Sequence, residues 1–320
     1  MKKEIKKIIL KNKKYTQIGK IPDYIPELYQ PQKRSNIGLT FIDNNQNVHK
    51  FGHAEEKFTI QSISKIVTLI LAILDNGIEK VFERVGYQGT DDPFNSFIKL
   101  DYINNKKPAN PLLNSGALVV TSLIKGKGKQ KFKRILDFTR KVAKNESIQL
   151  NEMVYKSEKE TGYRNQAIAS LLKSKGLLVG DLDNVLDTYF KQCSMNVTTT
   201  DLANIARFIS NDFISLEIDD KTRKKLSVLI KVIMNNCGMY DYSTEYSIKV
   251  GIPSKSGVGG GILGVLPNEM GIGVYSPALD EYGNSIVGMK IMEDLSEKFS
   301  WNIYGSNFKK GGNYQKDKKI

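Results

Sequence analysis

The stretch "FTIQSISKIVTLILAILDNG", residues 58–77, decides the fold because it joins a polar patch to a long apolar segment. Ser62 and Lys65 stand in the polar patch, three residues apart, so on a helix they share one face. The turns that follow are apolar nearly all round, which is typical of a helix buried at the centre of a protein. The sequence therefore predicts a central helix with a serine and a lysine at its beginning.

Strand patterns occur towards the two ends of the chain, in residues 35–54 and 250–291. The first is a predicted hairpin around an Asp/Asn cluster; in the second, Gly271–Tyr275 and Ser285–Ile291 are predicted strands and Glu293–Trp301 a final helix. Helical spacing or composition covers the middle, at residues 62–76, 115–125, 130–144, 164–174, 182–190, 199–210 and 220–236. This order predicts an α+β fold, in which both termini build one antiparallel sheet with helices packed on it and a helical lobe inserted, about residues 62–236.

The net charge of +14 is concentrated at the two ends of the 320-residue chain. Residues 1–20 carry +7 and residues 306–320 carry +4, which leaves +3 for everything between. A nucleic-acid groove needs basic residues on a folded face, preferably with aromatic side chains among them. We therefore expect solvated basic ends and no nucleic-acid partner: an N-terminal extension at 1–20, a single catalytic domain at 21–301 and a mobile tail at 302–320.

The longest apolar run, Ile66–Leu74, is far shorter than the roughly 20 residues that span a bilayer. The lysine-rich N-terminus has only Ile8–Leu10 as an apolar patch, which is not the hydrophobic segment of a secretory signal. Cys193 and Cys237 are too few for a disulfide framework and are not spaced as metal ligands. These patterns predict a cytoplasmic protein with buried thiols, no membrane contact and no metal site.

The S-x-x-K motif at Ser62 can carry nucleophilic chemistry. A lysine held neutral by burial or by a nearby cation can activate a serine, and the two histidines, His49 and His53, both fall in the predicted hairpin. The chain contains five S-x-x-K matches, but only the one at Ser62 opens a helix that is apolar nearly all round. A helix start also offers unpaired backbone N–H groups to a developing negative charge.

The second motif, Lys255-Ser256-Gly257 within "PSKSGVGGGILGV", is the only K-[ST]-G in the chain. Penicillin-recognising serine enzymes combine such a motif with S-x-x-K. Lys255 could depress the pKa of Lys65 and orient an anionic substrate, and the glycines allow a substrate or another backbone to approach closely. Backbone N–H groups of Ser62 and Val258 could form an oxyanion hole. Together the two motifs predict an acyl-serine enzyme.

Beyond these motifs, the chain resembles the serine-dependent glutaminases, which hydrolyse L-glutamine to L-glutamate and ammonia. The resemblance rests on "FTIQSISK", "KPANPLLNSGALVVTSL", "SEKETGYRNQAIA", "CGMYDYS" and "KSGVGGGILGV", in this order over roughly residues 21–290. These enzymes are relatives of the β-lactamases and penicillin-binding proteins. The resemblance therefore implies a β-lactamase/DD-peptidase-like form of the α+β fold, no cofactor, and a homo-oligomer, either a dimer or a tetramer.

The resemblance also implies roles for individual residues. Ser62 would be the nucleophile, Lys65 its activating base and Tyr240 a proton shuttle near the leaving ammonia. The substrate would be surrounded by Tyr24, Gln61, Asn114, Glu158, Asn165, Tyr189 and the backbone N–H of Val258, supported by Lys255, Ser256 and Gly257. These residue types suit glutamine, because a buried carboxylate such as Glu158 pairs with the α-ammonium and amide or phenol donors suit the α-carboxylate.

Considered without the family resemblance, the same residues and motifs also fit other roles and other functions. Taken singly, Asn114 also fits a helix cap, Glu158 a solvated face, and the tyrosines a core with bonded hydroxyls. A β-lactamase or peptidase would use the same motifs, although those enzymes act outside the cytoplasm. A non-catalytic glutamine-binding protein on the same scaffold has no need for a nucleophile and a base together. We therefore expect an amidohydrolase that acts on glutamine through a covalent acyl-serine intermediate.

Overall fold

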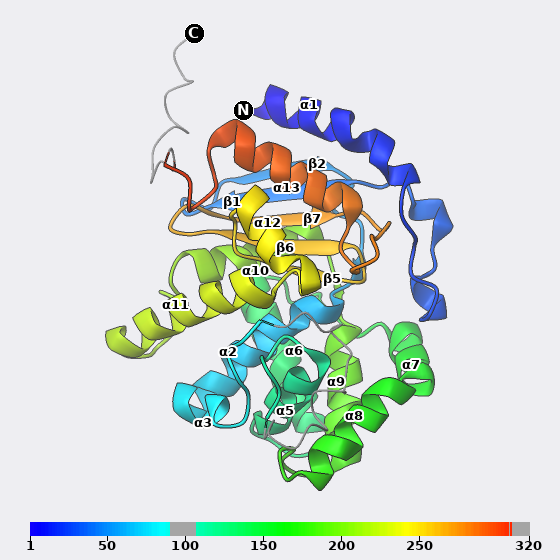
Figure 1. Ribbon diagram of the computed structural model, residues 1–320, viewed down its shortest axis with the longest axis vertical. Helices are drawn as coiled ribbons and strands as arrows, with labels where there is room; N and C mark the ends of the chain where they lie inside the picture. The colour runs from blue at the N-terminus through cyan, green and yellow to red at the C-terminus, as the bar shows by residue number, and fades with distance from the viewer. Residues whose placement is uncertain (90–106, 307, 309–320) are drawn as a thin grey trace.

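The computed structural model describes residues 1–89, 107–306 and 308, and contains a five-stranded antiparallel sheet between two layers of helices (Figure 1). The strand order is β2-β1-β7-β6-β5, so strands from the two ends of the chain lie side by side. The strands are β1 Gly38–Asp43, β2 Val48–Gly52, β5 Ser254–Gly257, β6 Gly261–Leu266 and β7 Met270–Tyr275. The predicted sheet built from both termini is confirmed.

The pairing of β1 with β7 joins the N-terminal hairpin to the C-terminal strands. Asp43 turns the hairpin, because its Oδ1 accepts the backbone N–H of Asn47 at 2.8 Å. Phe41 then lies opposite Ile272 in the β1–β7 ladder. The alternating apolar residues of β1 are buried in this position, which fixes the register of the sheet.

Helices cover both faces of the sheet. Helices α1 Lys2–Asn12 and α13 Ile286–Phe299 lie on one face, and α10 Thr199–Ser210 packs on the other (Figure 1). Helix α10 approaches β7 closely because of two glycines: a Cβ atom at Gly271 or Gly273 would lie 2.0 Å from a backbone oxygen of α10. The sheet therefore packs tightly on α10, and α10 also contacts the helices of the lobe.

Except for α12, the remaining described helices form the predicted lobe, in which α2 lies next to the sheet (Figure 1). The lobe also carries a two-stranded sheet of β3 Phe58–Thr59 and β4 Asn196–Val197. Its described helices are α2 Ser64–Asn76, α3 Ile78–Phe82, α5 Asn114–Leu123, α6 Lys129–Ala143, α7 Glu152–Thr161, α8 Tyr163–Ser174, α9 Leu182–Cys193 and α11 Asp220–Cys237. Helix α12 Ser243–Lys249 lies on the sheet side instead, where Tyr246 packs into the core shared with α13. Short 3₁₀ helices are η1 Lys13–Gln17, η2 Pro26–Leu28, η3 Pro31–Lys33, η4 Gln61–Ile63 and η5 Tyr240–Tyr242.

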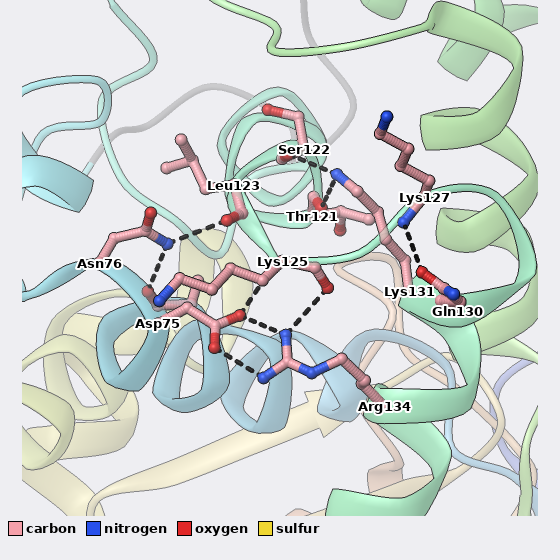
Figure 2. Close-up of polar contacts among 11 residues, drawn as sticks. Asp75, Asn76, Thr121, Ser122, Leu123, Lys125, Lys127, Gln130, Lys131 and Arg134 are labelled. Carbon is pink, nitrogen blue, oxygen red and sulfur yellow. Dashed lines mark hydrogen bonds and ion pairs between the residues drawn. The ribbon is translucent and has the colours of Figure 1, made fainter.

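Helix α2 is the central helix that the sequence predicts, since every residue from Ser64 to Ile73 is buried. Figure 2 shows how its far end is held. Arg134 of α6 donates two hydrogen bonds to Asp75, at 2.6 and 2.7 Å, and Asn76 donates to the carbonyl of Leu123 at 2.9 Å. A bidentate pair of this kind fixes orientation as well as distance. The helix is therefore anchored to α5 and α6 at one end, leaving its beginning to face the sheet.

The predicted strand Ser285–Ile291 is wrong. Helix α13 begins at Ile286 and continues to Phe299, with the Ser285 hydroxyl accepting the backbone N–H of Gly288 at 3.2 Å. Val287, Ile291 and Leu295 are fully buried at four-residue spacing, which makes one apolar face of a helix. A short apolar run does not distinguish a strand from a helix by itself. The Ser285 cap is the local feature that accompanies the helix in the structure.

Helix α7 was not predicted, although it carries Glu158. Its start has a recognisable signal: the side chain of Asn151 accepts the backbone N–H of Val154 at 3.1 Å, and Glu152 lies in the first turn. An Asn followed by an acidic residue is typical of a helix N-terminus. The weak apolar periodicity of residues 152–161 concealed the helix.

The expectation of a solvated N-terminal end is wrong for α1. Ile5 and Ile8 are buried in the core between the sheet and α13, and Asn12 donates to Asp294 of α13 at 2.6 Å. The lysines of α1 stay on its outer side. Of the predicted C-terminal tail, residues 307 and 309–320 lie outside the described residues, and the domain limits at residues 21 and 301 stay predictions. Among the described residues, no helix combines the length and the hydropathy needed to cross a membrane.

We predict that Ile5→Ala lowers the free energy of unfolding by about 2–4 kcal/mol, because it leaves a cavity at a side chain with 0% exposure. Urea denaturation followed by circular dichroism measures this change. Lys6→Ala, on the exposed side of the same helix, is the matched control and should change the free energy by less than about 0.5 kcal/mol. Equal effects of the two variants would show that α1 is not part of the core.

Candidate active site

A cavity of about 270 Å³ opens beside the beginning of α2. It contains Ser62 and all of the residues that the sequence predicts around a substrate, brought together from six segments of the chain. The lining residues are Tyr24, Ile25, Gln61, Ser62, Asn114, Glu158, Thr161, Gly162, Arg164, Asn165, Tyr189, Cys193 and Val258. Clustering of polar side chains in one concave site is typical of a small-molecule pocket.

Ser62 lies on a tight turn that the backbone reaches only under strain. Gln61 has φ = +48°, a left-handed conformation that is unfavourable for a residue with a Cβ atom. The hydroxyl of Ser64 donates to the carbonyl of Gln61 at 2.7 Å and so supports the turn. Ser62 follows this turn within η4, and its side chain therefore sits at the pocket wall.

The glycines of the second motif bring the sheet against this turn. A Cβ atom at Gly257 would lie 2.9 Å from the carbonyl oxygen of Ile60, and one at Gly259 would lie 2.3 Å from that of Thr59. Only glycine permits this approach, so the predicted close contact between the glycine-rich strand and another backbone is confirmed. Val258 lies between the two glycines and therefore reaches the pocket beside Ser62.

Lys65 is completely buried one turn after Ser62. Its Nζ donates to Asn114 Oδ1 at 2.6 Å and to the carbonyl of Leu112 at 3.0 Å. Burial lowers the pKa of Lys65 to about 8, while electrostatic interactions with Cys193 and Glu158 act in the opposite direction. A large fraction of this lysine is therefore neutral near pH 8.

Asn114 connects the lysine with the wall of the pocket. Its Oδ1 accepts from Lys65, while its Nδ2 donates to Asn165 Oδ1 of α8 at 2.9 Å. This pattern fixes the orientation of the Asn114 amide, since the lysine can only donate. The alternative of a simple helix cap does not apply, because the side chain caps no N–H of α5.

Glu158 is buried with only 7% of its surface exposed, and not on a solvated face. Burial raises the pKa of this carboxyl to about 7, although a hydrogen bond from Gln61 and the charge of Lys65 lower it. Tyr189 is buried beside it, and burial raises the pKa of its phenol. Tyr24, in contrast, is 56% exposed and lies at the mouth of the pocket.

Tyr240 lies behind Ser62, outside the pocket lining. Its hydroxyl donates to the carbonyl of Ser256 at 3.2 Å. Burial raises the pKa of the phenol, and a hydrogen bond with Ser62 acts against this rise. Tyr240 also has φ = +55°, so both residues that hold the serine from either side have left-handed backbones.

Lys255 is fully buried beneath Tyr240 and does not line the pocket. Its Nζ donates to the carbonyls of Gly238 and Ser256 and lies 4.3 Å from the centre of the Tyr240 ring. Burial, and next the charge of Lys65, hold the pKa of Lys255 well below its usual range. The structure therefore gives Lys255 contacts with Tyr240 and with the backbone, and none with the space a substrate would occupy.

Comparison with known proteins assigns the family of this chain. The family model named Glutaminase matches residues 19–304. A glutaminase of Clostridioides difficile is 49% identical over 302 residues, which is 94% of this chain and 97% of that protein. Glutaminase 2 of Clostridium perfringens is 47% identical over 95% of this chain and 100% of its own length. The chain belongs to the glutaminase family.

Solved structures of glutaminases have the same fold. A probable glutaminase of Bacillus subtilis superposes with a TM-score of 0.86 at 31% identity, covering 94% of this chain and 97% of that one. A probable glutaminase from Bacillus subtilis in complex with 6-diazo-5-oxo-L-norleucine has a TM-score of 0.84 at 30% identity, over 94% and 96% of the two chains. The predicted β-lactamase-like α+β fold of the glutaminase family is thereby confirmed.

The structure adds five lining residues to the set predicted for this glutaminase family member. They are Ile25, Thr161, Gly162, Arg164 and Cys193. Ile25 follows Tyr24 in the sequence, and Thr161, Gly162 and Arg164 lie between Glu158 and Asn165. Their nearness in sequence to predicted site residues could have indicated these four. Cys193 follows Tyr189 by four residues on α9, a spacing that puts both on one face.

We predict that neither cysteine of this glutaminase reacts with iodoacetamide at pH 8 while the protein is folded. Burial raises the pKa of the Cys193 thiol to about 12 and that of Cys237 to about 11, so the reactive thiolate is below about 1% of each. Mass spectrometry of labelled protein measures this, with urea-unfolded protein as the positive control. Labelling of Cys193 at the rate of a free thiol would contradict the predicted environment.

Proposed function

We propose that this chain hydrolyses L-glutamine to L-glutamate and ammonia through an ester of the γ-glutamyl group with Ser62. The observation that carries the proposal is that Ser62 and the buried carboxyl of Glu158 line one pocket, with the buried Lys65 bonded to the lining residue Asn114. Membership of the glutaminase family supports the substrate and the reaction. The glutaminase solved with 6-diazo-5-oxo-L-norleucine supports a pocket of this fold that takes a glutamine analogue.

Substrate binding follows from the charges of the lining residues. Ionised Glu158 pairs with the α-ammonium of glutamine and is thereby relieved of its burial cost. Donors at the remaining wall, the amides of Asn114 and Asn165 and the phenols of Tyr189 and Tyr24, suit the α-carboxylate. Gln61 orients Glu158 through the hydrogen bond between their side chains. The side-chain amide then points towards Ser62.

Acylation begins with proton transfer from the Ser62 hydroxyl to neutral Lys65. The serine oxygen attacks the γ-carbonyl carbon, and the resulting oxyanion is stabilised by the backbone N–H groups of Ser62 and Val258. Tyr240 delivers a proton to the departing nitrogen, so the C–N bond breaks with release of ammonia. Lys65 returns the proton that it took from Ser62 to the Tyr240 phenolate, which restores both the phenol and the neutral base.

Deacylation repeats the same steps with water. Water attacks the γ-glutamyl ester and gives a proton to Lys65. The C–O bond of the ester then breaks as Lys65 passes that proton to Ser62 Oγ, which releases glutamate and regenerates the serine hydroxyl and the neutral lysine. Lys255 supports both halves indirectly, because its Nζ lies against the ring of Tyr240. We further propose a cytoplasmic location and a homo-oligomer, supported by the sequence patterns and by the family resemblance; light scattering after gel filtration tests the second.

We predict that Ser62→Ala lowers ammonia release from L-glutamine by at least about 10⁴-fold, since no acyl ester forms. Ser170→Ala is the matched control, because Ser170 also opens an S-x-x-K match but lies on the exposed side of α8. A coupled ammonia assay measures both variants. Undiminished release by Ser62→Ala, or a preference of the native protein for a chromogenic β-lactam, would overturn the proposal; glutamine binding without turnover would indicate a binding protein.

We predict that kcat/KM for glutamine rises with pH between about pH 6 and 9. Glu158, with a pKa of about 7, must lose its proton to bind the α-ammonium, and Lys65, with a pKa of about 8, must be neutral to act as a base. Both groups must lose a proton, so activity rises with pH through each pKa. A plot of log kcat/KM against pH should therefore have a slope near two below pH 7 and near one between pH 7 and 8. Glu158→Gln should raise KM and leave only the upper step. A fall of kcat/KM across this range would contradict the assignment.

A further inference from the structure

The Tyr240 phenol is held against Ser62 by a turn whose backbone is strained. Tyr240 has φ = +55°, whereas the flanking helices α11 and α12 have ordinary right-handed backbones. A residue other than glycine keeps such a conformation only when its surroundings over-determine it. The hydrogen bonds of the neighbouring peptide groups show what these surroundings are.

Ser243, the first residue of α12, binds the backbone on both sides of Tyr240. Its Oγ accepts the N–H of Met239 at 3.0 Å and donates to the carbonyl of Tyr240 at 2.6 Å. The side chain is buried, with 3% of the residue exposed, so water does not compete for these bonds. One hydroxyl therefore fixes the peptide group that follows Tyr240 and the N–H of the residue before it, which limits where the phenol can point.

The loop before α13 supports the same turn from the other side. Asn284, which is completely buried, donates from Nδ2 to the carbonyl of Met239 at 3.2 Å. At Gly283 a Cβ atom would be in ordinary contact with both neighbours, 3.4 Å from Cγ1 of Val258 and 3.5 Å from Cε2 of Tyr240. This loop thus touches both the proposed proton shuttle and the residue that offers the oxyanion N–H.

We propose that Ser243 and Asn284 are positioning residues for catalysis, which hold the Tyr240 phenol at hydrogen-bond distance from Ser62. The proposal rests on the proton-shuttle role of Tyr240 put forward above. Neither residue lines the glutamine pocket, so neither contacts substrate. Because Tyr240 is also outside the lining, loss of its alignment should slow the chemical step and leave substrate binding nearly unchanged.

The experiment compares two serines one turn apart on α12. Ser247 makes similar contacts, donating to the carbonyls of Asn235 and Ser243 at 3.1 and 2.8 Å, but none with the Tyr240 turn. Ser243→Ala should lower kcat for glutamine by roughly 10- to 100-fold with KM changed less than about twofold. Ser247→Ala should keep kcat within about twofold. Thermal unfolding midpoints of both variants separate a general loss of stability from a loss of alignment.

A double-mutant cycle tests whether Ser243 acts through Tyr240. In a Tyr240→Phe background, Ser243→Ala should cost little further in kcat, since there is no phenol proton left to position. An unchanged 10- to 100-fold cost in that background, or a loss in Ser243→Ala no larger than in Ser247→Ala, would overturn the proposal. Full activity of Tyr240→Phe alone would instead reject the shuttle role, and the proposed hydrolysis itself is judged separately by Ser62→Ala.

Asn284→Ala provides a second variant in case Ser243→Ala does not fold. It removes the donor to Met239, together with a side-chain hydrogen bond to Asp280. It should give the same split, a lower kcat with a nearly constant KM, and the same non-additivity with Tyr240→Phe. A rise in KM with unchanged kcat would place Asn284 in substrate binding and overturn its assignment as a positioning residue.

Discussion

The burial of the Lys65 ammonium is the constraint on which the rest of the site depends. A cation without water needs hydrogen-bond acceptors, and its pKa falls even when they are supplied. Lys65 obtains the carbonyl of Leu112 and the Oδ1 of Asn114, which draws the start of α5 against the start of α2. Asn110 shapes that approach, because its Oδ1 accepts the N–H of Leu112 at 3.0 Å. The helix packing of the lobe and the chemistry of the lysine therefore have one origin.

The same exclusion of water adjusts the two ionisable groups in opposite directions. Burial disfavours the charged form of any group, so it lowers the pKa of Lys65 to about 8 and raises that of Glu158 to about 7. Both values come close to neutrality, although no histidine is among the described lining residues. A small change of environment, such as the arrival of an amino-acid zwitterion, is then enough to change the protonation of the site.

Backbone strain on either side of Ser62 is supported in one common way. Gln61 and Tyr240 both have left-handed backbones, and in each case the carbonyl accepts a hydrogen bond from a serine three residues later. These serines are Ser64 and Ser243, at 2.7 and 2.6 Å respectively. The two strained residues belong to different elements, Gln61 in η4 and Tyr240 in η5. The same type of serine-to-carbonyl hydrogen bond therefore supports both of them. Such strain keeps the Ser62 turn and the Tyr240 phenol in fixed positions before any ligand binds.

The sequence by itself predicted the antiparallel sheet from both termini, the buried helix α2, and Ser62 with Lys65, because periodicity and a motif at helical spacing are local properties. The glycines at 257 and 259 were also interpretable, since a glycine-rich strand indicates a close backbone approach. The sequence did not indicate that residues 285–291 form a helix or that α1 is packed, because short apolar runs gain their meaning from the surface that covers them. Only the tertiary structure showed that Lys255 lies under Tyr240 and away from the pocket, and that Ser243 and Asn284 hold its turn. Contacts between residues far apart in the chain depend on how the sheet packs against the lobe. A pattern within one short segment does not determine that packing.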